Sequence, residues 1–172
     1  MKYATTFGAS KIDKNSKEYK EGIELGYFLS KMGYIVKCGG YQGLMEAISI
    51  GVYNAGGTCI GITLKAFDAK RSKNPYLTKR VSCENLYQRI EKLIEDSTLF
   101  VVQTGSIGTL NELFMVLALK YGGMKPDIRI CLIGEIYQKI SKCDFLDESF
   151  VKNVEIYNDA NEFIKNFKLK KS

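Results

Sequence analysis

The sequence predicts an α/β fold in which a doubly wound, mostly parallel sheet carries helices on both faces. Short apolar runs alternate with amphipathic stretches of helical length along the chain, which is typical of successive βαβ units. Glycines stand where several apolar runs end and helical stretches begin. The 172 residues, 45% of them hydrophobic, suffice for one core. We therefore predict a single domain over residues 1–167, followed by a basic tail at 168–172.

In the first half of the chain, apolar runs of strand length are separated by helical patterns that end in glycine. The first helical stretch carries Tyr27, Phe28 and Leu29 on its apolar side and ends before Gly33, a residue that favours the left-handed conformation of a C-terminal cap. In order, we predict a strand at 2–7, a helix at 16–32, a strand at 34–38, a helix at 44–55 and a strand at 58–64.

In the second half, residues 65–78 are polar and contain Pro75, which predicts a loop or a short helix. The helix expected at 109–122 is apolar almost all the way round, which is typical of a helix that is buried in the monomer or packed against a second subunit. In order, we predict a strand at 79–83, a helix at 84–96, a strand at 97–102, a helix at 109–122, a strand at 128–133, a helix at 134–140, a strand at 154–157 and a helix at 159–167.

The composition restricts the chemistry of the chain. It contains no histidine, so Ser-His-Asp and Cys-His nucleophile pairs and histidine metal sites are excluded. Its five cysteines include no CxxC pair, so we expect neither a metal site nor a redox motif. Catalysis would have to rely on carboxylates, Arg, Lys, Tyr, backbone dipoles or water.

The charge distribution favours small anionic ligands. The formal net charge is +6, but the lysines are scattered over predicted helix surfaces and are not interleaved with aromatic side chains, so nucleic-acid binding is not indicated. No apolar run reaches the roughly 20 residues of a membrane span, and the N-terminus lacks the pattern of a secretory signal. We expect a cytoplasmic protein that does not associate with membranes.

Two glycine-rich loops follow predicted strands, CGGYQGLME at 38–46 and TGSIGTLNE at 104–112. In open α/β sheets, ligands bind beyond the carboxyl ends of the strands. Glycine lets backbone amides approach an oxyanion, and the following helix adds free amides and the positive end of its dipole. Neither loop matches GxxxxGK[ST] or GxGxxG, so bound nucleoside triphosphate or NAD is not expected. The loops instead predict a site for a phosphate group.

Each loop also has a purely structural interpretation. Thr109 and Glu112 have the spacing of a capping box, in which Thr109 caps the helix and Glu112 reaches back to its amide. The GGYQG loop could serve only as a turn with close helix–strand packing. Glu46, which follows that loop, is either an acid that gives a proton to a leaving group or one that stabilises a helix start.

Arg89 lies at the margin of an apolar helical stripe, between Leu86 and Leu93 in the helix predicted at 84–96. A guanidinium in this position either extends to solvent or binds a carboxylate or phosphate. Its planar fork of donors is well suited to both anions.

The Arg-bearing helix and the second loop together resemble the Lonely Guy (LOG) family, also labelled lysine decarboxylase-like. The family pattern is an Arg-bearing helix followed by PGGxGTxxE, and here Arg89 stands 15 positions before the first residue of TGSIGTLNE. GGYQGLMEA, the FGAS turn that ends at Ser10 and NPYLT are also similar to family segments. Thr104 and Ser106 replace the Pro and the second Gly of the pattern. Ser106 either supplies a hydroxyl donor or places a Cβ where the loop needs a positive φ.

The resemblance implies a Rossmann-like fold and hydrolysis of the N-glycosidic bond of a nucleoside 5′-monophosphate, which yields a free base and ribose 5-phosphate. It also implies a homodimer, an AMP-like ligand and no metal or organic cofactor. By the same resemblance, Glu112 and Arg89 are the catalytic residues: Glu112 would stabilise an oxocarbenium ion and orient water, and Arg89 would bind Glu112 or the substrate. The residues expected to bind the phosphate or the rest of the substrate are Gly105, Ser106, Ile107, Gly108, Thr109, Gly39, Gly40, Gly43, Met45, Gly8 and Ser10.

A binding protein is the alternative from another functional class. Thr104 and Ser106 favour a protein that holds a nucleotide or a molybdenum-cofactor-like pterin without turnover, whereas the presence of both Arg89 and Glu112 favours the hydrolase. Lysine decarboxylation is not indicated, because it needs pyridoxal phosphate on a Schiff-base lysine and neither glycine loop contains a lysine.

Overall fold

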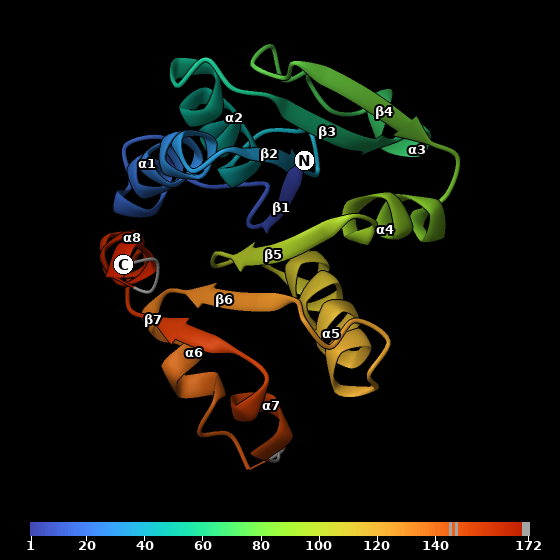
Figure 1. The fold of residues 1–172 in the computed structure, drawn as a ribbon. Helices are drawn as coiled ribbons and strands as arrows, with labels where there is room; N and C mark the ends of the chain where they lie inside the picture. Colours follow the sequence, from blue (N-terminus) through green and yellow to red (C-terminus); the bar gives the residue numbers. More distant parts are fainter. Residues whose placement is uncertain (145, 147, 170–172) are drawn as a thin grey trace.

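A seven-stranded parallel sheet runs through the molecule in the order β4-β3-β2-β1-β5-β6-β7 (Figure 1). This computed structural model describes residues 1–144, 146 and 148–169 of the chain. All six neighbouring strand pairs are parallel, which confirms the predicted α/β class. The strands are β1 (Lys2–Phe7), β2 (Tyr34–Cys38), β3 (Cys59–Leu64), β4 (Lys79–Cys83), β5 (Ser97–Val102), β6 (Arg129–Ile133) and β7 (Glu155–Tyr157).

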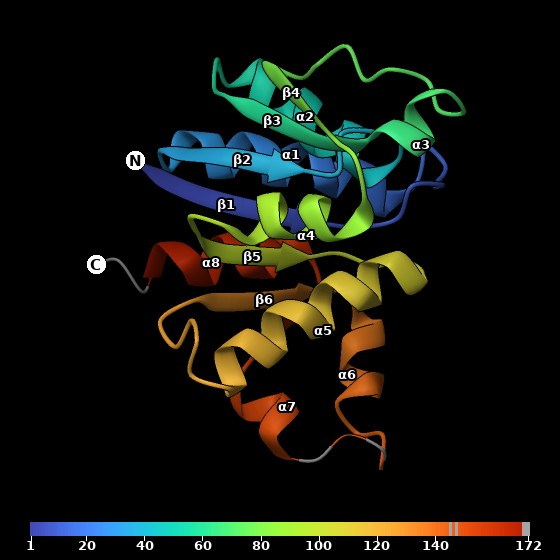
Figure 2. The ribbon, with the colours of Figure 1, turned by 90° about the vertical axis from the view of Figure 1, so that its right-hand side faces the viewer.

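Helices cover both faces of the sheet, as Figures 1 and 2 show. One face carries three helices and the opposite face four, while a short helix lies where β3 ends. The first face is covered by α1 (Lys17–Lys31), α2 (Leu44–Asn54) and α8 (Ala160–Leu169), the second by α4 (Leu86–Ile94), α5 (Ile107–Tyr121), α6 (Glu135–Ile140) and α7 (Glu148–Lys152), and the short helix is α3 (Lys65–Asp68).

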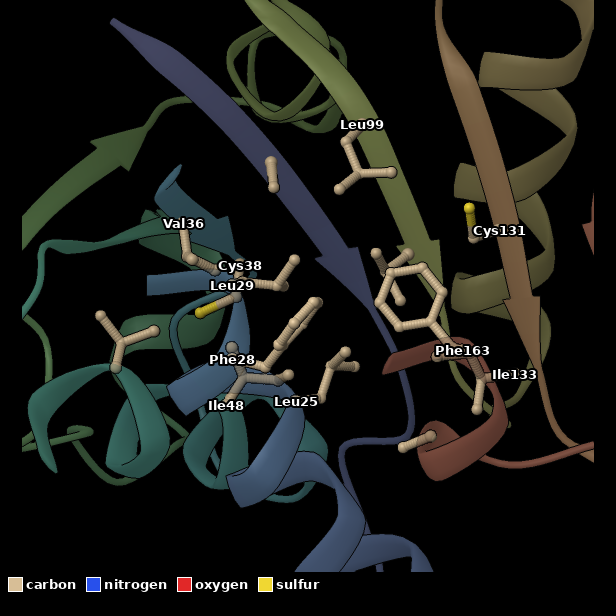
Figure 3. Packing of buried hydrophobic residues seen from close by; sticks show 14 of the residues in the cluster. Leu25, Phe28, Leu29, Val36, Cys38, Ile48, Leu99, Cys131, Ile133 and Phe163 are labelled. Atoms are coloured by element: carbon tan, nitrogen blue, oxygen red, sulfur yellow. The ribbon is translucent and has the colours of Figure 1, made fainter. Parts of the chain in front are cut away.

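Each face of the sheet contributes to a separate apolar core. In β5, Leu99 and Val101 face the α1–α2–α8 side, whereas Phe100 and Val102 face the opposite side. Central parallel strands are buried on both faces, which is why these runs are apolar without alternation. Figure 3 shows the first core, in which Phe28 and Phe163 pack edge to face at 6.1 Å between ring centroids.

Local signals fix several helix ends. Ser16 accepts a hydrogen bond from the Tyr19 amide at 3.2 Å and caps α1, and Gly33 follows that helix with a φ of +81°. Asn85 accepts one from the Gln88 amide at 3.0 Å and caps α4. These caps satisfy donors that a helix start leaves unpaired.

Several details differ from the sequence prediction, among them α4, which is two residues shorter at each end than predicted. Tyr27, expected on the apolar side of α1, is 46% exposed. Helix α7 was not expected, α5 begins two residues before the predicted helix, and α8 continues to Leu169, within the predicted tail. Residues 170–172 of that tail lie outside the described residues. Among the described residues, no helix is long and apolar enough to cross a membrane.

The sheet has a topological switch point between β1 and β5. The chain leaves β1 for α1 on one face and leaves β5 for α5 on the other. The two strand ends stay paired, because the Gln103 amide donates to the Phe7 carbonyl at 2.8 Å and the Ala9 amide to the Thr104 carbonyl at 2.9 Å. Diverging connections of this kind open a crevice beyond the carboxyl ends of the strands.

Candidate functional site

A cavity of about 700 Å³ lies at this switch point. The FGAS turn after β1 and the first turns of α5 form one part of its wall, and α4, the segment after β3 and the start of α2 form the rest. Of the residues predicted to bind substrate or act in catalysis, those that line the cavity are Gly8, Ser10, Met45, Arg89, Ser106, Ile107, Gly108, Thr109 and Glu112.

The start of α5 presents backbone donors to this cavity. Ser106 occupies the N-cap position but its side chain makes no capping hydrogen bond, unlike the caps of α1 and α4. The Leu110 amide donates to the Ser106 carbonyl at 3.1 Å, so the amides of Ile107, Gly108 and Thr109 precede the first intrahelical bond. Free amides at the positive end of a helix dipole favour an anion.

Arg89 is buried and does not extend to solvent. Its Nε donates to the Ile62 carbonyl at 2.9 Å, its Nη2 to the Gly39 carbonyl at 3.4 Å and its Nη1 to Oε1 of Glu112 at 3.3 Å. All three ends of the guanidinium therefore have an acceptor, and the two carbonyls fix its plane. The close approach of the guanidinium requires glycine at position 39, because a Cβ there would collide with it.

Glu112 faces the cavity rather than the helix cap. Its carboxylate pairs with Arg89, and the two side chains are 13% and 10% exposed. The capping-box interpretation is therefore wrong, because Ser106, not Thr109, is the N-cap and Glu112 bonds across to α4. Burial raises the pKa of Glu112 to about 7, although the neighbouring Arg89 lowers it. A carboxyl group with this pKa takes up and releases protons near neutral pH.

The first glycine loop supports the site from behind. Gly39 binds Arg89, but Gly40 and Gly43 do not line the cavity. Gly40 and Gly43 have φ values of +79° and +73°, and Gly43 packs so closely against Ala9 and Ser10 that a Cβ would clash there. In this loop glycine serves the turn and close packing, as its structural interpretation holds.

Gly105 and Glu46 also lie away from the main cavity. Gly105 lines a neighbouring hollow that Ser10 and Ser106 also border. Glu46 is held by the Tyr19 hydroxyl at 3.0 Å and by Lys14 at 2.9 Å, and it is not among the residues lining the cavity. This pairing argues against a role for Glu46 as proton donor to a leaving group.

Several cavity residues were not predicted as site residues. The segment after β3 contributes Phe67 and Arg71, α4 contributes Leu86 and Ile90, and α5 contributes Phe114. Nothing in the local sequence of 65–78 marks it as a cavity wall, because its placement depends on contacts with distant residues. The apolar side chains of α4 and α5 resemble ordinary core positions in sequence.

A family model decides the relationship that the loops suggested. The model described as the SLOG cluster4 family matches residues 2–157. The chain belongs to this LOG-related family. The match includes both glycine loops, Arg89 and Glu112, so the resemblance read from the motifs is confirmed at family level.

Two curated plant proteins are similar to part of the chain. The probable cytokinin riboside 5′-monophosphate phosphoribohydrolase LOGL6 of Oryza sativa subsp. japonica is 31% identical over 104 residues, 59% of this chain and 42% of that protein. The cytokinin riboside 5′-monophosphate phosphoribohydrolase LOG1 of Arabidopsis thaliana is 32% identical over 105 residues, 60% of this chain and 49% of that protein. The aligned part thus spans less than half of each relative.

Solved structures of the same fold match nearly the whole chain. TM1055, a structural genomics target, has a TM-score of 0.73 at 27% identity, covering 98% of this chain and 99% of that one. The molybdenum cofactor binding protein of Rippkaea orientalis has a TM-score of 0.74 at 19% identity, covering 100% and 99%. The molybdenum cofactor carrier protein of Chlamydomonas reinhardtii has a TM-score of 0.71 at 20% identity, covering 98% of both chains. The last two show likeness of fold alone.

The departures from the family's loop pattern are accommodated locally. Ser106 has a φ of −104°, which an ordinary L-residue adopts without strain, so its Cβ does not disturb the turn. The Thr104 carbonyl accepts a hydrogen bond from the Ala9 amide, so the threonine side chain does not prevent this contact with the FGAS turn. The turn that presents the amides of α5 is formed with both replacements in place.

Proposed function

We propose that this protein hydrolyses the N-glycosidic bond of nucleoside 5′-monophosphates, releasing the free base and ribose 5-phosphate. The observation that carries the proposal is the buried pair of Arg89 and Glu112 beside the uncapped start of α5, inside one cavity. The curated relatives with a phosphoribohydrolase name support the same reaction class.

In this proposal, the 5′-phosphate binds the free amides at the start of α5, with Thr109 beside them. The sugar then lies near Glu112, one helical turn further on. As the bond from the anomeric carbon to the base nitrogen breaks, its electron pair leaves with the base and positive charge develops on the sugar. The Glu112 carboxylate stabilises this charge and accepts a proton from the water that attacks the anomeric carbon. The base takes up a proton as it leaves.

Arg89 acts on this reaction through Glu112. It lowers the pKa of a carboxyl group that burial raises, and so favours the ionised form that the reaction requires. Its bonds to the carbonyls of Ile62 and Gly39 hold the guanidinium, and hence the carboxylate, in a fixed position. Preorganised charge in a buried site is the usual source of such stabilisation.

The test is incubation with AMP, CMP, GMP and IMP, with chromatography to detect free base. We expect release by the wild-type protein and a loss on the order of 100-fold or more in the Glu112→Gln variant. Glu24→Gln, which alters an exposed acid on α1, is the control and should retain activity. Release of base at the same rate by wild type and Glu112→Gln would contradict the proposal.

A carrier for a nucleotide or a pterin such as that of the molybdenum cofactor is the second candidate. Thr104 and Ser106 in the loop favour it, and the fold likeness to two molybdenum cofactor proteins is compatible with it. Tight binding of a nucleotide or pterin without release of base from any nucleoside monophosphate would establish this function in place of hydrolysis.

We also propose that two copies of the chain associate through α4 and α5. Among the described residues, seven of the twelve large hydrophobic side chains that are exposed lie on or next to these helices. An apolar groove of about 340 Å³ runs between them, and Ile90 lines both this groove and the cavity. A second copy over this face would therefore also border the cavity. The seven side chains are Leu86, Tyr87, Ile107, Phe114, Met115, Tyr121 and Met124.

A further inference from the structure

The cavity contains a second guanidinium that the proposed reaction does not use. Arg71 follows α3 and lines the cavity together with Phe67. Its guanidinium carbon lies 4.6 Å from the ring centroid of Phe67 and 4.9 Å from that of Tyr41. Cation–π contacts of this kind hold the guanidinium in place while leaving the donors along its edge available.

Arg71 has no carboxylate partner among the described residues. Asp68, the acid of α3, is already bound by Arg80, by the Ser82 hydroxyl at 2.8 Å and by the Tyr41 hydroxyl at 2.9 Å. Arginine carries five donors and no acceptor, and a half-buried guanidinium that binds no acceptor among the described residues is suited to an acceptor on a ligand.

The segment that carries Arg71 is anchored on both sides of it. The buried Asn74 donates to the Tyr41 carbonyl at 3.2 Å and to the Ser49 hydroxyl at 3.0 Å. The Gln42 side chain donates to the Ser72 carbonyl. These bonds tie the segment to the first glycine loop and to α2, so Arg71 is held at the cavity by the fold.

The cavity that Arg71 borders has several apolar lining residues and is suited to a planar ring. Met45, Phe67, Leu86, Ile90 and Phe114 line the cavity with it. Of the described residues, three with charged side chains line the cavity, Arg71, Arg89 and Glu112. Arg89 and Glu112 bind each other, so Arg71 is the one of these three available to recognise the ring of a ligand. A flat heterocycle buried among these side chains would present its edge to the guanidinium.

From these contacts we propose that Arg71 selects a ring whose edge carries two adjacent acceptors, an oxo group and a ring nitrogen. This inference rests on the proposed function and names its substrate class: 6-oxopurine nucleotides, GMP and IMP, in preference to AMP. Guanine and hypoxanthine offer O6 and N7 to a guanidinium fork, whereas adenine places an amino donor at position 6. The oxo and ring-nitrogen edge of a pterin offers the same pair of acceptors.

The experiment compares kcat/KM for release of base from GMP, IMP and AMP. We expect the wild-type protein to favour GMP and IMP by about tenfold or more. Arg71→Gln should reverse the preference towards AMP, because a glutamine amide both donates and accepts and so pairs with N7 and the amino group of adenine. Arg71→Lys should keep the charge and a weaker preference, because an ammonium group also donates to O6 and N7 but lacks the planar fork. Lys70→Gln, at an exposed neighbour, is the control and should change nothing.

Calorimetric titration with ribose 5-phosphate and with 6-hydroxymethylpterin monophosphate separates this inference from the proposed function. Release of base that needs Glu112 but is as fast from AMP as from GMP overturns the inference and leaves the hydrolase intact. An equal loss for all three nucleotides in Arg71→Gln also overturns it. Pterin binding that needs Arg71, without release of base from any nucleotide, overturns both the hydrolase and the nucleotide preference and favours the pterin carrier. Absence of base release from every nucleotide, together with absence of binding by both probes, overturns both.

Discussion

At the residue scale, the pair of Glu112 and Arg89 combines two opposing effects. Burial disfavours the charged carboxylate more strongly than the guanidinium at 3.3 Å favours it, which is why the pKa of Glu112 rises to about 7. A group with this pKa is held by the fold at a cost in stability near neutral pH. Such a cost is common where a side chain serves a site rather than the core.

This cost predicts that the free energy of unfolding depends on pH differently in wild type and in Glu112→Gln. Because the pKa of Glu112 is raised on folding, its stabilising contribution is full below pH 4.5 and is lost as pH rises through 7. The free energy of unfolding of wild type should fall relative to that of the variant, by up to about 3 kcal/mol across this range. Urea unfolding between pH 5 and 8 measures it. Parallel curves for the two proteins would show that Glu112 is not buried as described.

Arg89→Met should impair both stability and activity. The change leaves the carbonyls of Ile62 and Gly39 without this donor and leaves Glu112 without its cation. We expect a loss of about 3 kcal/mol in the free energy of unfolding, measured in urea. The pKa of Glu112 should rise further, so the acidic limb of the pH–rate profile should move to higher pH. Lys92→Met, on the same helix, is the control, and an unshifted limb would show that Arg89 does not act through Glu112.

At the element scale, the start of α5 offers a matched pair of glycines. A Cβ on Gly105 would collide with the side chain of the buried Thr109, whereas one on Gly108 would meet nothing within 4 Å and would enter the space at the helix start. A side chain at position 105 would therefore disturb the packing of the protein, whereas a side chain at position 108 would only take up space outside the helix start.

Gly108→Ala should stabilise the protein yet weaken binding of a phosphate. Replacing a glycine within a helix by alanine gains up to about 1 kcal/mol, read as a higher Tm. The added methyl group would occupy the place of the anion, so the Kd for ribose 5-phosphate should rise about tenfold or more. Gly105→Ala should instead lower the Tm. Unchanged affinity in Gly108→Ala would mean that no phosphate binds at this helix start.

Secondary structure was predictable wherever a local signal sets it. Buried strands such as β5 are apolar throughout, and Ser16 and Gly33 mark the ends of α1 by side-chain capping and positive φ. Helix α7 escaped prediction because its five residues bury only Phe150 and give no helical period. The cavity wall around Arg71 escaped prediction too, because distant residues hold it in place. Asn74 bonds to residues 25 and 33 positions away in sequence, and Gln42 bonds to Ser72, 30 positions away.

The site itself was predictable only in part. The spacing of Arg89 and the second glycine loop indicated the LOG family, but sequence left open whether Glu112 caps its helix or faces a ligand. That choice depends on the tertiary position of α4 against α5, which brings a carboxylate and a guanidinium 23 residues apart into contact. The first loop shows the converse, because Gly40 and Gly43 serve packing although their pattern suggested binding.

At the scale of the whole molecule, seven of the twelve large hydrophobic side chains that are exposed in the described part of the chain lie on or next to α4 and α5. Helix α5 was expected to be buried or to meet a second subunit, and within one chain only Thr109, Leu113 and Val116 of its side chains are buried. Tyr87 on α4 is 86% exposed beside it. Monomeric proteins rarely leave such a contiguous patch uncovered, and a stable interface needs roughly 800 Å² per partner.

Substitution Met115→Glu should therefore convert a dimer into a monomer. Met115 lines the groove between α4 and α5, and a buried carboxylate there would oppose Glu91 and Glu95 on its rim. Light scattering should give twice the 19.4 kDa chain mass for wild type and the single mass for the variant. Tyr53→Glu, at an exposed position near the end of α2, should remain dimeric. Since Ile90 joins groove and cavity, kcat/KM should fall in the monomer, and a monomeric wild type would remove this interface altogether.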